Sequence, residues 1–331
     1  MVDLLKIDWQ HDDGVNIPMI NDFLRNQFYD NILKDTVQDR VCLEIGFGTG
    51  ILSLLALKHG AKHIIAYESD SLRYQLGLEI IKQLGYSNSI TLINGRYTAD
   101  TLTTHPEVEL IFTETIDGRL WGESLWKSFP HDADVEFIPG QYFLNVYAVP
   151  ISKEMAKGLL TTNGDRIEFN PGVDVDENFI RLINQYLVSS YGNQASGVTT
   201  VELKSGITEI KQQHNPIWFH MPQMKLLDSL EPIVGYTVDL AKKKVIAHDS
   251  VSVQELALDS TDITLTVDTR EWVDSIMLLI PRVGTQHGKH QMFLDKGTWG
   301  ALSPMLVIDA NKNIKINHSF ETGFIGYNFN E

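Results

Sequence analysis

The chain has 331 residues, of which 43% are hydrophobic and 21% are charged, so it is long enough for one large or two medium globular domains. Its net charge of −16 argues against a nucleic-acid or anionic-membrane surface and would attract basic partners, although acidity also serves solubility alone. The single cysteine, Cys42, excludes a disulfide framework. Without a signal peptide or a long apolar stretch in the sequence, we expect a cytoplasmic protein.

The first 140 residues predict alternating helices and strands. Apolar spacing predicts a helix over 19–34, a strand over 41–45 and a helix from about Ile51 to a stop at Gly60. Further strands are expected over 64–67, 90–93 and 110–113, with a helix over 72–84 between the first two. This order predicts an α/β fold, with a Rossmann-like parallel sheet covered by helices over residues 1–140.

The pattern changes after Pro139-Gly140. Short alternating segments follow and predict strands over 142–149, 234–240, 244–248, 263–267, 275–280 and 306–308. They indicate a second, mostly β and barrel-like domain over 141–331. Residues 151–192 are polar and are expected to form a helical insertion that packs on another surface, such as a second subunit.

Two glutamates, Glu114 and Glu123, stand nine positions apart in a loop that follows the strand over 110–113. Two carboxylates on one short loop can form a fork for a planar cation with several donors, and guanidinium has that geometry. The alternative is a pair of solvated loop acids. We call residues 114–123 the double-glutamate loop.

A glycine-rich turn predicts a cofactor site. Gly46, Gly48 and Gly50 lie between a strand and a helix, but Ile51 breaks the dinucleotide-binding pattern G-x-G-x-x-G. Glu68 ends the next strand, where an acid can accept both hydroxyls of a ribose, unless it is merely an exposed strand-end acid. A ribose-bearing cofactor without a pyrophosphate is favoured, and S-adenosyl-L-methionine fits that description.

These motifs resemble the protein arginine N-methyltransferases over roughly residues 15–150. The run Val41-Cys-Leu-Glu-Ile-Gly-Phe-Gly-Thr-Gly50 is similar to the cofactor-binding motif of that family, and Ala66-Tyr-Glu-Ser69 to its ribose-binding strand end. Upstream, Met19-Ile-Asn-Asp-Phe-Leu-Arg-Asn-Gln-Phe-Tyr29 resembles its N-terminal helix. Glu114 and Glu123 have the separation of its two loop glutamates.

The resemblance implies a role for each matching residue. Arg25 would hold the methionine carboxylate of S-adenosyl-L-methionine, and Thr98 falls near an adenine-contacting position. Glu114 and Glu123 would be catalytic: they orient and polarise a substrate arginine, and one of them accepts its proton. Methyl would then pass in line from sulfur to nitrogen.

Further residues would shape the substrate pocket, with Met19 in the N-terminal helix, Asp117 in the loop and Trp299 in a late loop. Asp117 followed by Gly122-Glu123 is nearer the monomethylating branch of the family than the dimethylating one, so monomethylarginine is the expected product. The late loop reads Gly297-Thr298-Trp299 and lacks the histidine usual in the family. This departure puts the closure of the arginine pocket in doubt.

The resemblance also implies partners: an arginine-containing protein or peptide as substrate, and a second copy of the chain in a homodimer built on the 151–192 insertion. No metal is expected, because the spacing of the histidines fits no zinc pattern. Two rival interpretations stay open. One is a non-catalytic scaffold that keeps the fold, and the other is a methyltransferase for a small guanidino or amine compound.

Overall fold

The computed structural model describes fourteen segments of the chain. These are residues 23–116, 120–121, 125–128, 135–151, 161–163, 166–168, 217–220, 230–249, 252–257, 262–268, 276–294, 302–309, 313–323 and 325–330.

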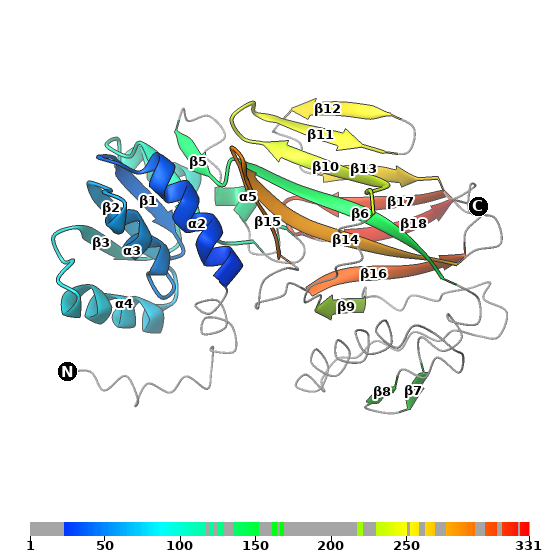
Figure 1. Ribbon diagram of the computed structural model, residues 1–331, viewed down its shortest axis with the longest axis horizontal. Helices are drawn as coiled ribbons and strands as arrows, with labels where there is room; N and C mark the ends of the chain where they lie inside the picture. The colour runs from blue at the N-terminus through cyan, green and yellow to red at the C-terminus, as the bar shows by residue number, and fades with distance from the viewer. Residues whose placement is uncertain are drawn as a thin grey trace.

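A five-stranded parallel sheet forms the first domain, in the order β3-β2-β1-β4-β5 (Figure 1). Its strands are β1 (Val41–Ile45), β2 (His63–Glu68), β3 (Ile90–Asn94), β4 (Leu110–Thr113) and β5 (Glu136–Ile138). The helices are α2 (Phe23–Thr36), α3 (Ile51–Lys58), α4 (Ser71–Gln83) and the short α5 (Leu125–Ser128), with a 3₁₀ helix, η3, at Ala99–Thr104. Helices α2 and α3 pack against each other, and α4 packs on β3 and β2.

The register of the three central strands sets up one functional edge. Ile45 at the end of β1 is paired with Tyr67 on β2 and with Thr113 on β4. The residues that follow each of them therefore leave the sheet together at the carboxyl edge, where open α/β sheets place their ligands.

The second domain is mostly antiparallel. One eight-stranded sheet holds β6 (Gln141–Ile151), β9 (Ile217–His220), β10 (Val234–Asp239), β11 (Lys244–His248), β12 (Val253–Ala257), β14 (Ile276–His287), β15 (His290–Phe293) and β16 (Leu302–Asp309). A three-stranded sheet holds β13 (Asp262–Val267), β17 (Asn313–Ser319) and β18 (Ile325–Asn330). The predicted fold class, a Rossmann-like sheet followed by a mostly β domain, is confirmed.

The helical prediction for the insertion is wrong where the structure describes it. Two short antiparallel strands, β7 (Thr161–Asn163) and β8 (Arg166–Glu168), lie inside the 151–192 range, and its remaining residues apart from Ile151 are outside the described segments. In the sequence, the two residues Gly164-Asp165 separate these strands, and a Gly-Asp pair between two short strand segments is a local hairpin signal.

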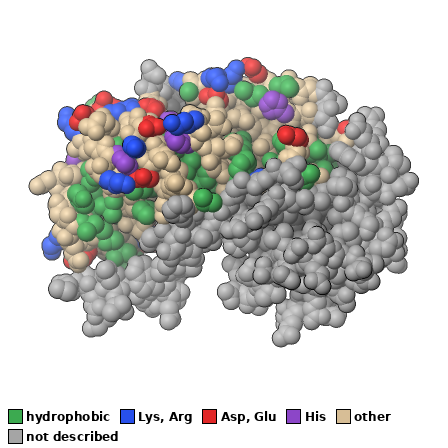
Figure 2. Space-filling view, in the orientation of Figure 1, with side chains coloured by type: hydrophobic (Ala, Val, Ile, Leu, Met, Phe, Trp, Pro, Cys, Tyr) green, Lys and Arg blue, Asp and Glu red, His purple; other side chains and the backbone are tan. Residues whose placement is uncertain are grey.

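Charged and apolar side chains are unevenly distributed over the described surface in this view. Figure 2 shows charged residues of both signs along its upper edge, and hydrophobic side chains toward the lower part of the first domain, where Figure 1 places α3 and α4. The large hydrophobic residues exposed on the first domain are Leu24 on α2, Leu72 and Leu78 on α4, and Leu84 just after it. Within the described segments, no helix combines the length and apolarity needed to cross a membrane.

Candidate active site

The glycine-rich turn connects β1 to α3 with three left-handed residues. Gly46, Gly48 and Gly50 have φ values of 78°, 54° and 77°, which other residues adopt at a cost. A Cβ on Gly50 would lie 2.4 Å from the ring of Phe47. The backbone N–H groups of Gly46 and Phe47 both donate to the carbonyl of Tyr67, at 3.0 and 2.9 Å. The turn is therefore tied to the end of β2.

Glu68 faces this turn at the end of β2. One carboxylate oxygen accepts from the N–H of Gly48 at 2.9 Å, and the other accepts from the N–H of Asp70 at 2.8 Å. The residue is 3% exposed, which rules out the alternative of an exposed strand-end acid. Each oxygen keeps a lone pair for a further donor, so the carboxylate can still accept the two hydroxyls of a ribose.

Glu44, inside β1, is a second buried acid that the sequence interpretation did not assign to the site. It is 1% exposed and accepts a hydrogen bond from the hydroxyl of Ser53 on α3. Its pKa is raised to about 8: burial is the largest cause, the Ser53 hydrogen bond and Arg25 oppose it, and Glu68 adds a smaller increase. At neutral pH its carboxyl is thus largely protonated, which keeps one negative charge out of the site. The sequence signal that could have identified Glu44 as a site residue is a single acid within an otherwise apolar strand.

A buried ion pair joins α2 to the double-glutamate loop. The guanidinium Nη2 of Arg25 lies 2.8 Å from Oε2 of Glu114, and these side chains are 7% and 4% exposed. Arg25 is therefore a buried arginine and not a surface one. One turn along α2, the hydroxyl of Tyr29 donates to the carbonyl of Thr113 at 2.8 Å, which anchors the helix to the strand that carries Glu114.

Glu114 and the glycine turn are in direct proximity. A Cβ on Gly46 would lie 3.1 Å from Cγ2 of Thr115, the residue after Glu114. The hydroxyl of Thr113 donates to the carbonyl of Ile45, which ties the two strand ends together at 2.9 Å. The predicted guanidinium-binding acid therefore lies beside the predicted cofactor turn.

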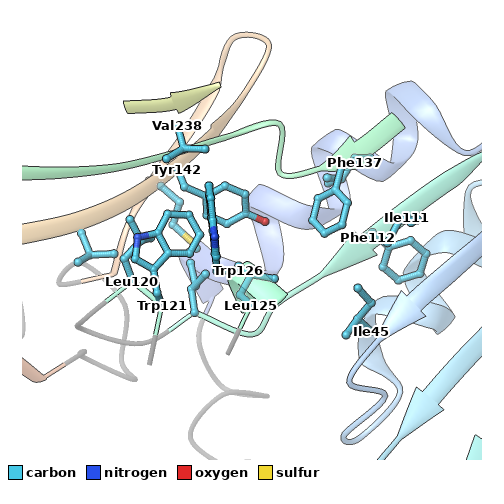
Figure 3. Packing of buried hydrophobic residues seen from close by; sticks show 14 of the residues in the cluster. Ile45, Ile111, Phe112, Leu120, Trp121, Leu125, Trp126, Phe137, Tyr142 and Val238 are labelled. Carbon is cyan, nitrogen blue, oxygen red and sulfur yellow. The ribbon is translucent and has the colours of Figure 1, made fainter. Parts of the chain in front are cut away.

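The far limb of the double-glutamate loop is buried between the two domains. Leu120 and Trp121 are both 0% exposed, and the Trp121 ring packs against Trp126 of α5 and Tyr142 of β6, with ring centroids 5.3 and 5.6 Å apart (Figure 3). Burial, then Tyr29, then Glu114 raise the pKa of Tyr142 well above its ordinary value.

Several predicted site residues are outside the described segments. Met19, Asp117, Glu123 and Trp299 are among them, and their roles stay predictions. Thr98 is described: it is exposed and caps η3, where its backbone N–H donates to the hydroxyl of Thr101 at 2.7 Å. Its adenine contact also stays a prediction. Within the described residues, no group of three or more His, Cys, Asp or Glu side chains could hold a metal ion.

No family model matches the chain, but curated proteins do. The protein arginine N-methyltransferase 1 of Saccharomyces cerevisiae is 33% identical over 130 residues, which are 38% of this chain and 37% of that protein. The protein of the same name from Oryza sativa subsp. indica is 38% identical over 104 residues, which are 30% of this chain and 26% of that protein. The match thus spans well under two thirds of either relative.

The similarity in fold extends further than the similarity in sequence. A crystal structure of PRMT6-SAH superposes with a TM-score of 0.53 at 15% identity, covering 95% of this chain and 98% of that one. At this identity the superposition speaks for the fold alone. The chain is therefore similar to protein arginine N-methyltransferases in sequence over about a third of its length, and it shares the fold of PRMT6 over nearly all of it.

Proposed function

We propose that the chain is an S-adenosyl-L-methionine-dependent methyltransferase that transfers a methyl group to a guanidino nitrogen of arginine in a protein or peptide. The observation that carries this proposal is the position of Glu114, ion-paired to a guanidinium and next to the glycine turn. The names of the curated relatives support the same activity.

The residues around the turn fit the cofactor. Glu68 offers acceptors for a ribose diol, the glycines allow close approach of the backbone, and Arg25 offers a cation for a carboxylate. When bound, S-adenosyl-L-methionine supplies an electrophilic methyl group on a sulfonium. The groups that would hold it surround the carboxyl edge of β1, beside Glu114.

The two loop glutamates would activate the substrate. A guanidinium stays charged up to a pKa above ~12 and is a poor nucleophile, because its lone pair is delocalised. Glu114 and Glu123 would bind its N–H groups and direct one nitrogen at the methyl carbon. That nitrogen would displace sulfur at the methyl carbon, with the carbon–sulfur electron pair staying on sulfur, and one of the two carboxylates would take the nitrogen-bound proton directly or through water.

The finer parts of the proposal concern product, assembly and location. Asp117 would add negative charge and crowd a methylated nitrogen, so monomethylarginine is the proposed product. A homodimer would bury apolar surface such as Leu24, Leu72 and Leu78. A cytoplasmic location agrees with Cys42, which is a buried free thiol and the one cysteine of the sequence.

A transfer assay separates this proposal from its rivals. The protein is incubated with methyl-labelled S-adenosyl-L-methionine and either an arginine-rich peptide or free guanidino compounds, while cofactor binding is measured by calorimetry. The proposal expects label on the peptide and its loss in Glu114→Gln and Glu123→Gln, with Glu107→Gln, an exposed acid away from the site, as the matched control. Cofactor binding without transfer would favour a scaffold, and label on small compounds alone would favour the small-molecule enzyme.

A further inference from the structure

A hydrogen-bonded chain joins the double-glutamate loop to two strands of the second domain. The indole N–H of Trp121, two residues before Glu123, donates to the hydroxyl of Tyr236 on β10 at 2.8 Å. The same hydroxyl lies 2.8 Å from Nδ1 of His318 on β17. These three residues are 0%, 1% and 1% exposed, so water does not compete for their polar atoms.

The chemistry of the three groups fixes the direction of the first of these two hydrogen bonds. An indole N–H can only donate, so the Tyr236 oxygen must accept from Trp121. The phenol has one proton to give, and donation to Nδ1 of His318 would require the His318 tautomer with its proton on Nε2. Burial raises the pKa of Tyr236 well above its ordinary value, with the Trp121 hydrogen bond lowering it, so the phenol keeps the proton that it donates.

Aromatic side chains pack against the same three hydrogen-bonded residues. The ring of Phe320 packs against both Trp121 and Tyr236, with centroid distances of 5.4 and 5.3 Å. Trp126 also packs on Phe320 at 4.7 Å. The loop residue Trp121 is thus enclosed by side chains of the second domain, and a shift of the indole would disturb all of these contacts at once.

The backbone conformation of Leu120, the residue before Trp121, indicates that tertiary contacts hold this part of the loop. Leu120 has a φ of 65°, a left-handed value that is unfavourable for a side chain branched like leucine, and it is fully buried. Such a residue persists where neighbouring contacts determine its conformation more strongly than its own preference does. Among the described residues, Trp121 contacts Tyr236 on β10, Tyr142 on β6, Trp126 and Phe320, and these contacts act in that direction.

We propose that Tyr236 and His318 are positioning residues for methyl transfer: they hold Trp121 in place and thereby fix the limb of the loop that carries Glu123. This inference rests on the proposed function. It also gives the second domain a role in catalysis, because the position of Glu123 would depend on strands more than 100 residues further along the chain.

The test compares variants that differ by one hydrogen-bonding atom. Tyr236→Phe removes the shared hydroxyl, and Tyr97→Phe is its control, because the buried hydroxyl of Tyr97 has no hydrogen-bond partner among the described residues. His318→Asn keeps an acceptor near the position of Nδ1, and His318→Leu does not. Three quantities are measured: kcat on an arginine-rich peptide, the Kd of S-adenosyl-L-methionine, and amide hydrogen exchange of a peptide spanning 120–126.

We expect kcat to fall between about tenfold and a hundredfold in Tyr236→Phe and His318→Leu, with the cofactor Kd unchanged. Exchange over 120–126 should rise in the same two variants, while exchange over 41–50 stays as in the wild type. His318→Asn should recover most of the rate. A merely structural role would instead lower cofactor binding and the rate together, in proportion to lost stability.

Two results would overturn the inference: a rate and an exchange pattern in Tyr236→Phe that match those of Tyr97→Phe, or equal losses in His318→Asn and His318→Leu. If the wild-type protein transfers no methyl group to any arginine substrate, the proposed function fails by itself. The exchange measurement then decides alone whether Tyr236 and His318 hold the loop.

Discussion

The guanidinium of Arg25 lies 2.8 Å from the carboxylate of Glu114, and both side chains are more than nine-tenths buried. The first loop glutamate therefore already holds a guanidinium in the same way that it would hold a substrate arginine. Removing one partner of a buried pair leaves the other charge uncompensated, which makes both residues sensitive to substitution.

Arg25→Ala tests this pair directly. We expect the affinity for S-adenosyl-L-methionine to fall by at least about tenfold, because the variant lacks the cation that we propose binds the cofactor carboxylate. The free energy of unfolding should also fall by roughly 3 kcal/mol, as Glu114 is left buried without its cation. Lys34→Ala removes an exposed cation from the same helix and is the control. Unchanged cofactor affinity in Arg25→Ala, measured by calorimetry, would refute the assigned role.

Alanine substitutions at two glycines with similar φ values distinguish the cost of backbone strain from the cost of a steric clash. Gly50 and Gly85 have φ values of 77° and 78°, but a Cβ meets the Phe47 ring at Gly50 and nothing within 4 Å at Gly85. Both alanine variants should lose about 1 kcal/mol from the left-handed backbone. Gly50→Ala should lose more, together with cofactor binding. Thermal unfolding and calorimetry measure both effects, and equal behaviour of the two variants would contradict the close fit of the turn.

The raised pKa of Glu44 predicts a dependence of stability on pH. In the unfolded chain the carboxyl ionises near its ordinary value of 4.5, whereas in the folded protein it keeps its proton up to about 8. Its contribution to stability is therefore complete below pH 4.5 and is lost as the pH rises toward 8, at up to about 1.4 kcal/mol per pH unit. Glu44→Gln should flatten this slope in urea unfolding experiments. A wild-type slope that survives the substitution would mean that Glu44 is ionised in the folded state.

Glu136 on β5 predicts the opposite dependence. The side chain of His287 on β14, 3.6 Å away, and that of Arg40 hold its pKa at about 2, against the effect of burial. The stabilisation is present above pH 4.5 and is lost as the pH falls toward 2. Since the Glu136 side chain is 39% exposed, solvent screening keeps the effect within about 1 kcal/mol. The stability difference between wild type and Glu136→Gln should shrink under acid, and Glu255→Gln, which removes an exposed acid of β12, provides the baseline.

The sequence predicted the parts of this protein that depend on local pattern. The strand, glycine turn and helix over 41–58 and the placement of Glu68 at a strand end follow from periodicity and turn chemistry, and the structure has them where expected. Arg25 and Glu114 are 89 positions apart, and the sequence predicts a cofactor-binding role for Arg25 but not its ion pair with Glu114. No local sequence signal indicates an ion pair between residues so far apart.

Long-range contacts explain what the sequence left out. Trp121 meets Tyr236 across 115 positions, and Tyr236 meets His318 across 82. Strand β17, although Ile314, Ile316 and His318 alternate along it, was not among the predicted strands, so its histidine could not be assigned to any surface. The burial of Glu44 could not be predicted either, because one sequence shows that the residue is acidic but not that its strand is covered on both faces.

The most direct test of the account is mass spectrometry of an arginine-rich peptide after incubation with the protein and isotopically labelled S-adenosyl-L-methionine. The account predicts one labelled methyl group on an arginine side chain, formed by the wild-type protein and by Glu107→Gln but not by Glu114→Gln. Labelled methyl groups on another residue type, or an undiminished yield from Glu114→Gln, would contradict it.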